Sequence, residues 1–505
     1  MPLDMLRRDF LAASLAATAA GLAAPALNGR KRPHLFLVMT DQQRFDTLGC
    51  MGNKAIRTPN LDALAKDGVV FTHGYCSTPS CTPARAGLLT GQSPWHHGML
   101  GYGKVAKSYP VELPRLLAEG GYHTFGIGKM HYAPQRALHG FRGTLLDESG
   151  RIESPDFVSD YRQWFRQTAP HLDPDATGIG WNDHRAAPYA LPANLHPTRW
   201  TSQTAIDYVE HYRGEEPLFL KVSFARPHSP YDPPKPFWDM YRDEDMPEPA
   251  LGDWAARFAD HPGKQAPDAA FGDFGPDHVR RSRRGYYGAI SFIDAHIGRF
   301  LAALKRKGIY DDSLILFTSD HGDMMGDHHH WRKTYAFEGS SHIPFIVKWP
   351  KGMEAGLKRG SRLDGPVELR DVLPTFLDAA GVPIPPAVDG RSLLDRVRQP
   401  KGPWREWIDL EHSLTYEPQN DWCGLTDGRV KYVFFRRDGA EMLFDLVKDP
   451  GETRNLAGQP GEADRLALWR GRMAEHLAER GGDWAHEGRP LPRAKSQVYS
   501  LHYPK

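Results

Sequence analysis

Short apolar runs alternate with helical segments along most of this 505-residue chain, and this alternation limits the fold more than any other feature. Such runs, bounded by polar residues, are typical of buried strands. Helical spacing falls between them, at residues 112–119 and 285–305. The sequence therefore predicts an α/β fold with a large, mostly parallel central sheet flanked by helices on both faces. The expected strands cover residues 34–40, 122–127, 218–224, 314–318 and 342–349.

Polar side chains follow four of these expected strands. In an open α/β sheet, ligands bind outside the carboxyl ends of the strands, so these side chains should converge on one cleft. A single Asp after a strand is usually a turn former, but four strands that end in this way favour a functional site. The residues are, in chain order, Asp41 and Gln42, Lys129 and His131, His228, and Asp320 and His321.

A second candidate element is the stretch Cys81-Thr82-Pro83-Ala84-Arg85. Pro83 suits the first turn of a helix. Cys81 would then lie at a helix N-terminus, where free N–H groups favour an anion. Arg85, one turn further on, adds a fixed positive fork for a tetrahedral oxyanion. The alternative is a buried cysteine beside a helix-opening proline.

The stretch from Cys81 to Arg85 resembles the Cys-x-Pro-x-Arg motif of type I, formylglycine-dependent sulfatases. The resemblance continues in order over nearly the whole chain, through residues 40–46, 128–131, 224–230, 318–323, 371–375, 389–393 and 443–456. It implies an alkaline-phosphatase-like fold with a catalytic domain over residues 27–400. It also implies a smaller α+β subdomain over residues 401–505, with a four-stranded antiparallel sheet and a packed helix.

The resemblance also implies roles for the candidate residues. Cys81 would be oxidised by a formylglycine-generating enzyme, and the hydrated aldehyde would attack a sulfate ester. Arg85, with the metal, would orient the nucleophile and bind ester oxygens, and Lys129 and Lys333 would add positive charge. His228, with Lys333, would donate a proton to the leaving alcohol, and His131 would accept one. One divalent metal ion would be held by Asp41, Gln42, Asp320 and His321.

Two of these metal positions depart from the pattern common among sulfatases. Gln42 and His321 stand where many relatives have Asp and Asn. Oxygen ligands suit Ca²⁺, whereas imidazole shifts the preference toward ions such as Mn²⁺. The metal is therefore left open between Ca²⁺ and Mn²⁺. Similar choices occur in phosphonate monoester hydrolases of the same superfamily.

Two alternatives to a sulfatase remain at this point. The first is a phosphonate monoester or phosphodiester hydrolase. The second is a non-catalytic relative that binds sulfated glycans, which would have no need of an oxidisable cysteine in its motif. Residues 155–200 and 230–276 are expected to form loops over the site and to decide the substrate.

The N-terminal residues 1–26 resemble a twin-arginine signal peptide, with Arg7 and Arg8 before an Ala-rich run. We therefore expect export by the twin-arginine machinery to the periplasm or the medium.

A net charge of +1 gives no reason to expect a nucleic-acid partner. Cys76 and Cys81 are close enough in sequence to form a disulfide, which would prevent oxidation of Cys81 to the aldehyde.

Overall fold

The computed structural model describes residues 32–261 and 266–504. An eight-stranded sheet forms its centre, in the order β4-β3-β5-β1-β6-β7-β2-β8. Only β7 runs against its neighbours. The mostly parallel sheet is thus confirmed, and the expected signal peptide lies outside the described residues. The strands are β1 (His34–Asp41), β2 (Val69–Tyr75), β3 (His123–Gly128), β4 (Gly143–Leu146), β5 (Leu218–Pro227), β6 (Ser313–Ser319), β7 (Phe345–Lys348) and β8 (Ser361–Glu368).

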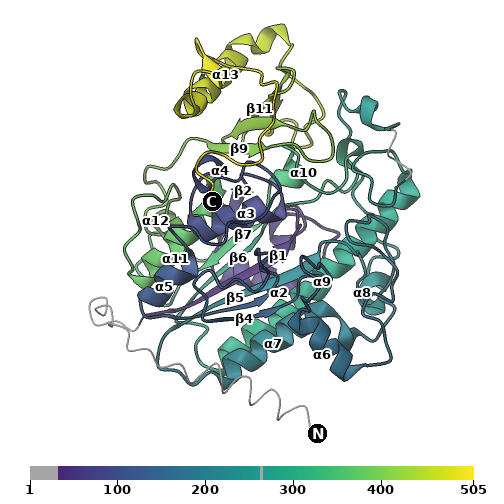
Figure 1. The fold of residues 1–505 in the computed structure, drawn as a ribbon, viewed down its shortest axis with the longest axis vertical. Helices are drawn as coiled ribbons and strands as arrows, with labels where there is room; N and C mark the ends of the chain where they lie inside the picture. The colour runs from purple at the N-terminus through teal and green to yellow at the C-terminus, as the bar shows by residue number, and fades with distance from the viewer. Residues whose placement is uncertain (1–31, 262–265, 505) are drawn as a thin grey trace.

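Helices cover both faces of this sheet (Figure 1). The helices packed on the central sheet and its loops are α2 (Pro59–Lys66), α3 (Cys81–Thr90), α4 (Pro94–His97), α5 (Leu113–Glu119), α6 (Asp160–Thr168), α7 (Pro197–His211), α8 (Lys235–Asp239), α9 (Pro276–Arg306), α10 (Glu338–Ser341), α11 (Val372–Ala380) and α12 (Leu393–Arg398). The segments expected as loops therefore contain α6, α8 and the first residues of α7.

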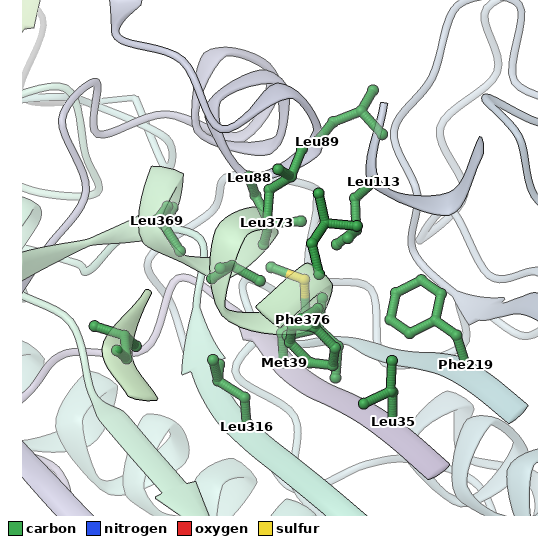
Figure 2. Close-up of a cluster of buried hydrophobic side chains, with 14 of the residues drawn as sticks. Leu35, Met39, Leu88, Leu89, Leu113, Phe219, Leu316, Leu369, Leu373 and Phe376 are labelled. Carbon is green, nitrogen blue, oxygen red and sulfur yellow. The ribbon is translucent and has the colours of Figure 1, made fainter. Parts of the chain in front are cut away.

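Alternate residues of β1 enter two different cores, as the period of a strand requires. Leu35, Leu37 and Met39 pack with side chains of α3, α5 and α11, and Figure 2 shows part of this cluster. Phe36 and Val38 pack on the other face with side chains of α2, α7 and α9. Both faces of β1 are thus buried, which explains why residues 35–39 are apolar without interruption.

A smaller unit with α13 (Ala463–Leu477) follows the central sheet and lies at one end of the molecule (Figure 1). Leu466, Trp469 and Met473 of α13 pack on one face of its sheet. The expected four-stranded sheet with a packed helix is confirmed. Its strands are β9 (Ile408–His412), β10 (Trp422–Thr426), β11 (Val430–Phe435) and β12 (Glu441–Asp445), in the order β12-β11-β10-β9, and a further hairpin is formed by β13 (Ala485–His486) and β14 (Arg489–Pro490).

A buried ion-pair network joins this small sheet to the segment that follows β6. Lys431 Nζ of β11 lies 2.8 Å from Glu338 Oε1 of α10 and 2.8 Å from Glu452 Oε1. It also donates to the Ala336 carbonyl. The Lys431 side chain is completely buried.

Over the part of the chain that the structure describes, no helix has the length and apolar character needed to cross a membrane.

We predict that Lys431→Ala lowers the free energy of unfolding by about 3–5 kcal/mol, because two buried carboxylates lose their shared cation. Lys448→Ala is the matched control, because the Lys448 side chain is 82% exposed and its ion pair with Asp445 is long, at 3.9 Å. The free energy of unfolding of this variant should stay within about 0.5 kcal/mol of the wild-type value. Denaturant unfolding of both variants measures the difference. Equal effects would show that the network does not stabilise the fold.

Candidate active site

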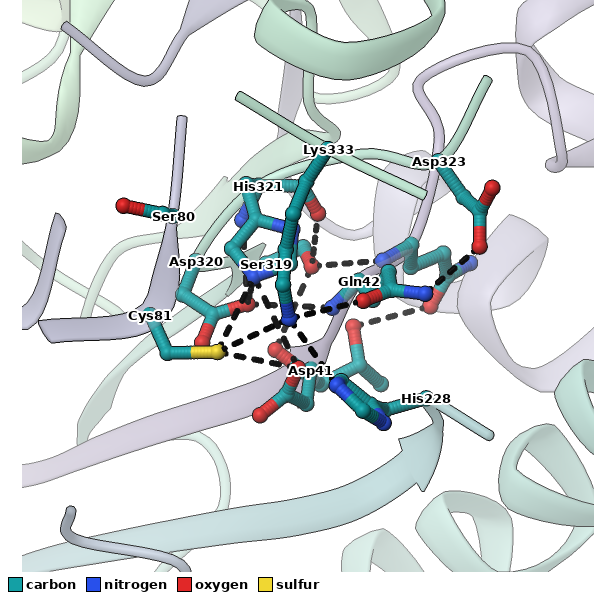
Figure 3. A network of polar contacts seen from close by, with 12 residues as sticks. Asp41, Gln42, Ser80, Cys81, His228, Ser319, Asp320, His321, Asp323 and Lys333 are labelled. Atoms are coloured by element: carbon teal, nitrogen blue, oxygen red, sulfur yellow. Dashed lines mark hydrogen bonds and ion pairs between the residues drawn. The ribbon is translucent and has the colours of Figure 1, made fainter. Parts of the chain in front are cut away.

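Four parallel strands deliver polar side chains to one edge of the sheet. β1 lies between β5 and β6, and β3 lies on the far side of β5. Asp41 is the last residue of β1, and Lys129, His228 and Asp320 directly follow β3, β5 and β6. Because these strands run in the same direction, residues almost 280 positions apart meet at their carboxyl ends, as Figure 3 shows for three of the four.

Cys81 faces this edge from the first residue of α3. Its sulfur lies 3.2 Å from Lys333 Nζ, 3.3 Å from His321 Nε2 and 3.9 Å from Lys129 Nζ. Burial and the Asp41 carboxylate would raise the pKa of the thiol, but the neighbouring Lys129, Lys333 and His321 outweigh them and lower that pKa to about 6. The position thus favours an anionic or oxyanion-forming group.

The four cysteines are free thiols. Cys76 donates from its sulfur to the Thr78 carbonyl at 3.1 Å instead of pairing with Cys81. The disulfide alternative is therefore not what the structure contains. The residue before Cys81 contacts the smaller unit, because Ser80 Oγ lies 2.8 Å from His412 Nε2 of β9.

Two carboxylates and two cations are buried together beneath Cys81. Arg85 Nη2 lies 2.9 Å from Asp320 Oδ2 and 3.4 Å from Asp41 Oδ2. Lys129 forms an ion pair with Asp41. None of these four side chains is exposed to solvent. Burial opposes ionisation of Asp41, but Lys129 and the other cations hold its pKa well below the usual range.

The donor set fits a divalent cation. Ligand atoms of Asp41, Cys81, Asp320 and His321 lie within 4.8 Å of one another. The Nδ1 atom of His321 contacts the Gly322 carbonyl at 2.9 Å, so Nδ1 carries the proton. Burial lowers the pKa of His321, but Asp320 outweighs burial and raises that pKa above its usual value, so His321 is a cation beside Cys81 until it gives up its second proton. The lone pair of Nε2 would then face Asp41 and Asp320, at 3.7 and 3.6 Å. This is the tautomer that a metal-binding imidazole requires.

The fourth predicted metal ligand, Gln42, has a fixed amide orientation. Its Nε2 donates to Asp323 Oδ2 at 2.5 Å, so its Oε1 points the other way and accepts from Lys333 Nζ at 2.9 Å. Because Asp323 is acceptor-only when ionised, the oxygen and not the nitrogen of Gln42 faces the site. Tyr231 also donates to Asp323, at 2.5 Å.

Lys333 and His228 form a contact pair on the other side of the sulfur (Figure 3). Lys333 Nζ lies 2.9 Å from His228 Nε2, and His228 Nδ1 lies 3.1 Å from the Ser229 carbonyl. An ammonium and a carbonyl at its two nitrogens make this imidazole neutral, with its proton on Nδ1. Burial, followed by the charge of Lys333, lowers the pKa of His228 accordingly.

His131 is near this network but is not hydrogen-bonded to it. The backbone N–H of His131 donates to Glu148 Oε1 at 2.9 Å. Both ring nitrogens are buried and have no hydrogen-bond partner within residues 32–261 and 266–504. The ring lies 6.2 Å from that of Tyr102. Thus nine of the ten predicted site residues share one contact network, and His131 stands beside it.

Sequence reasoning missed three residues that shape this site. Asp323 orients Gln42, and its place three residues after Asp320 could have indicated it. His412 lies in the smaller unit, where nothing in the local sequence indicates a contact with the residue before Cys81. Trp181 lies on the ring of His228, with centroids 3.8 Å apart. It comes from the segment expected to cover the site, but no strand precedes it.

Known proteins resemble this chain over most of its length. Residues 33–382 match the family model described as Sulfatase, and residues 326–479 match one described as N-sulphoglucosamine sulphohydrolase, C-terminal. An arylsulfatase of Clostridium perfringens is 39% identical over 89% of this chain and 95% of that protein. A choline-sulfatase of Rhizobium meliloti is 31% identical over 86% of this chain and 85% of that protein.

A solved structure also has this fold. The phosphonate monoester hydrolase of Agrobacterium radiobacter superposes with a TM-score of 0.76 at 26% identity, over 92% of this chain and 100% of that one. The family match spans well over half of the chain, and the arylsulfatase match spans nearly all of it. The chain therefore belongs to the sulfatase family, a family of sulfuric ester hydrolases.

Proposed function

We propose that this protein hydrolyses sulfate esters with a nucleophile formed by oxidation of Cys81 to formylglycine. One observation carries the proposal: the Cys81 side chain is buried at a helix N-terminus, with Lys333 at 3.2 Å and Lys129 at 3.9 Å. Burying two lysines against a reactive side chain is costly. A protein that only binds sulfated glycans has no use for that arrangement, so the contacts favour catalysis.

A divalent cation would be held by Asp41, Gln42, Asp320 and His321, and when bound it would supply a Lewis acid toward the ester oxygens. Cationic side chains of the protein would also stabilise negative charge on the ester. Arg85, Lys129 and Lys333 exceed the two carboxylates by one positive charge. Positive charge that is already in place stabilises a sulfuryl group as negative charge develops on it.

The hydrolysis consumes one water and breaks the bond between sulfur and the leaving oxygen, which then takes up a proton. The 2.9 Å contact between Lys333 Nζ and His228 Nε2 makes these two residues a shared proton source for that oxygen. His131, whose buried ring nitrogens have no partner in the described part of the chain, is free to accept a proton when the product leaves.

A second candidate activity is hydrolysis of phosphonate monoesters or phosphodiesters. The metal site has only two carboxylates, Asp41 and Asp320, since Gln42 and His321 are neutral ligands in the state described above. Less negative charge repels an anionic phosphorus ester less. The likeness to a phosphonate monoester hydrolase supports this as a side activity.

Oxidation of Cys81 requires a formylglycine-generating enzyme as partner. Cys81 is only 1% exposed in the folded chain, so such an enzyme must act before folding closes the site. This order agrees with export of an already folded protein by the twin-arginine machinery, as the expected signal peptide suggests. We therefore propose a periplasmic or secreted location.

We predict that Cys81→Ala abolishes ester hydrolysis, with a loss of at least about a thousandfold in kcat, because the nucleophile is gone. Cys76→Ala is the matched control: it also removes a buried thiol, but one that contacts only a carbonyl among the described hydrogen bonds. It should keep most of the activity. The kcat of each variant is measured on 4-nitrophenyl sulfate. Similar losses of kcat in the two variants would count against Cys81 as the nucleophile.

We also predict that Mn²⁺ supports activity at least as well as Ca²⁺, because an imidazole replaces one oxygen ligand. The metal-stripped enzyme is reloaded with each ion and assayed on aryl sulfates and on phosphonate monoesters. Measurable activity on both esters is expected. Activity confined to Ca²⁺ and to sulfate esters would contradict this interpretation of Gln42 and His321.

A further inference from the structure

Trp181 lies on the imidazole of His228. The two rings are stacked, with centroids 3.8 Å apart and planes 18° apart. Trp181 belongs to the irregular segment between α6 and α7, whose sequence gives no sign of a catalytic role. His228 is completely buried, whereas Trp181 is half-buried. The indole therefore covers one face of the imidazole and separates it from solvent.

The turn that carries Trp181 is tied to the residue that follows His228. Ser229 Oγ contacts the Gly180 carbonyl at 3.2 Å and also hydrogen-bonds to the Asp183 carbonyl. Asp183 N–H in turn donates to the Gly180 carbonyl at 3.2 Å. The single hydroxyl proton of Ser229 thus holds one end of the short turn, the Asp183 N–H ties that end to Gly180, and the turn fixes the indole relative to the imidazole.

Two cations also lie over the indole. Lys129 Nζ is 4.7 Å from the ring centroid, and the guanidinium carbon of Arg151 is 5.3 Å from it. Cations at such distances are attracted by the π system. The ring is thereby held from several sides, and it contacts both a proposed proton donor and a proposed charge-stabilising lysine.

We propose that Trp181 is a positioning residue that acts through His228, and this inference rests on the proposed function. The imidazole has two hydrogen bonds, to Lys333 and to the Ser229 carbonyl, and hydrogen bonds at ring nitrogens fix the direction of the ring within its own plane. They resist tilting out of that plane only weakly. Stacking at 3.8 Å supplies that resistance and keeps water off the ring.

The competing role for Trp181 is a platform on which an aryl leaving group stacks. The contacts disfavour it, because the indole already stacks on His228 and has Lys129 and Arg151 over it. The two roles differ in their dependence on the substrate. A positioning role matters most when the leaving oxygen needs a proton, whereas a platform matters most when the leaving group is aromatic.

The test measures kcat/KM of Trp181→Ala and Trp181→Phe on 4-nitrophenyl sulfate and on a simple alkyl sulfate. A nitrophenolate leaves without a proton, but an alkoxide does not. We expect Trp181→Ala to lose at least about tenfold more activity on the alkyl ester than on the nitrophenyl ester, as loss of general-acid alignment predicts. Trp181→Phe, which can still stack, should restore most of that difference.

A double-mutant cycle isolates the dependence on His228. In a His228→Asn background, Trp181→Ala should cost little further activity on the alkyl ester, because the residue through which it acts is absent. Trp164→Ala is the control for loss of a half-buried tryptophan, since Trp164 packs on Tyr161 within α6. It should leave the leaving-group dependence unchanged.

Three results would overturn the inference: equal losses on both esters, a larger loss on the nitrophenyl ester, or full additivity with His228→Asn. If Trp181→Ala does not fold, Trp181→Leu replaces it, because leucine keeps apolar bulk but cannot stack on the imidazole, and it should show the same leaving-group dependence. A wild-type enzyme that is inactive on all of these esters, with Cys81 converted, would refute the proposed function itself. An active wild type with unaffected Trp181 variants would refute only the role of Trp181.

Discussion

The active site depends on the burial of Asp41 and Asp320 with Arg85 and Lys129 at the carboxyl edge of the sheet. Charges out of water are tolerated only when each has close partners. The strand order supplies those partners, because β1 lies between β5 and β6 and β3 is one strand further away. The Arg85 guanidinium on α3 then ties the helix that begins at Cys81 to two of these strand ends. The strand order therefore brings the four charges together, and each buried charge is stabilised by its neighbours.

Much of this arrangement could be predicted from the sequence. Strands buried on both faces, such as β1, are continuous apolar runs, and their polar ends mark the site. β2, β4 and β8 are not predicted: polar residues interrupt the apolar pattern of β2 and β8, and β4 has only four residues. The reversed direction of β7 has no local signal either. Contacts that link distant segments, such as His412 with Ser80 and Trp181 with His228, depend on the fold and not on any pattern.

The smaller C-terminal unit contributes to the site as well as to stability. β9 contacts the residues just before Cys81, through His412 and through the Glu411 N–H, which donates to the Ser77 carbonyl at 2.8 Å. Lys431 of β11 holds the segment around Glu338, which follows Lys333 in the chain. The loop before Cys81 and the segment after Lys333 thus contact the same small sheet. The smaller unit is therefore joined to the central sheet by hydrogen bonds and buried ion pairs next to the site.

The most direct test of the account is the chemical state of Cys81 in active enzyme. Trypsin should release residues 67–85 as one peptide that contains both Cys76 and Cys81. Tandem mass spectrometry then locates any change between the two positions, with Cys76 as the internal control. We expect Cys81 to have lost its sulfur and become an aldehyde, and specific activity to rise in proportion to the converted fraction. Full activity with an intact Cys81 thiol would contradict it.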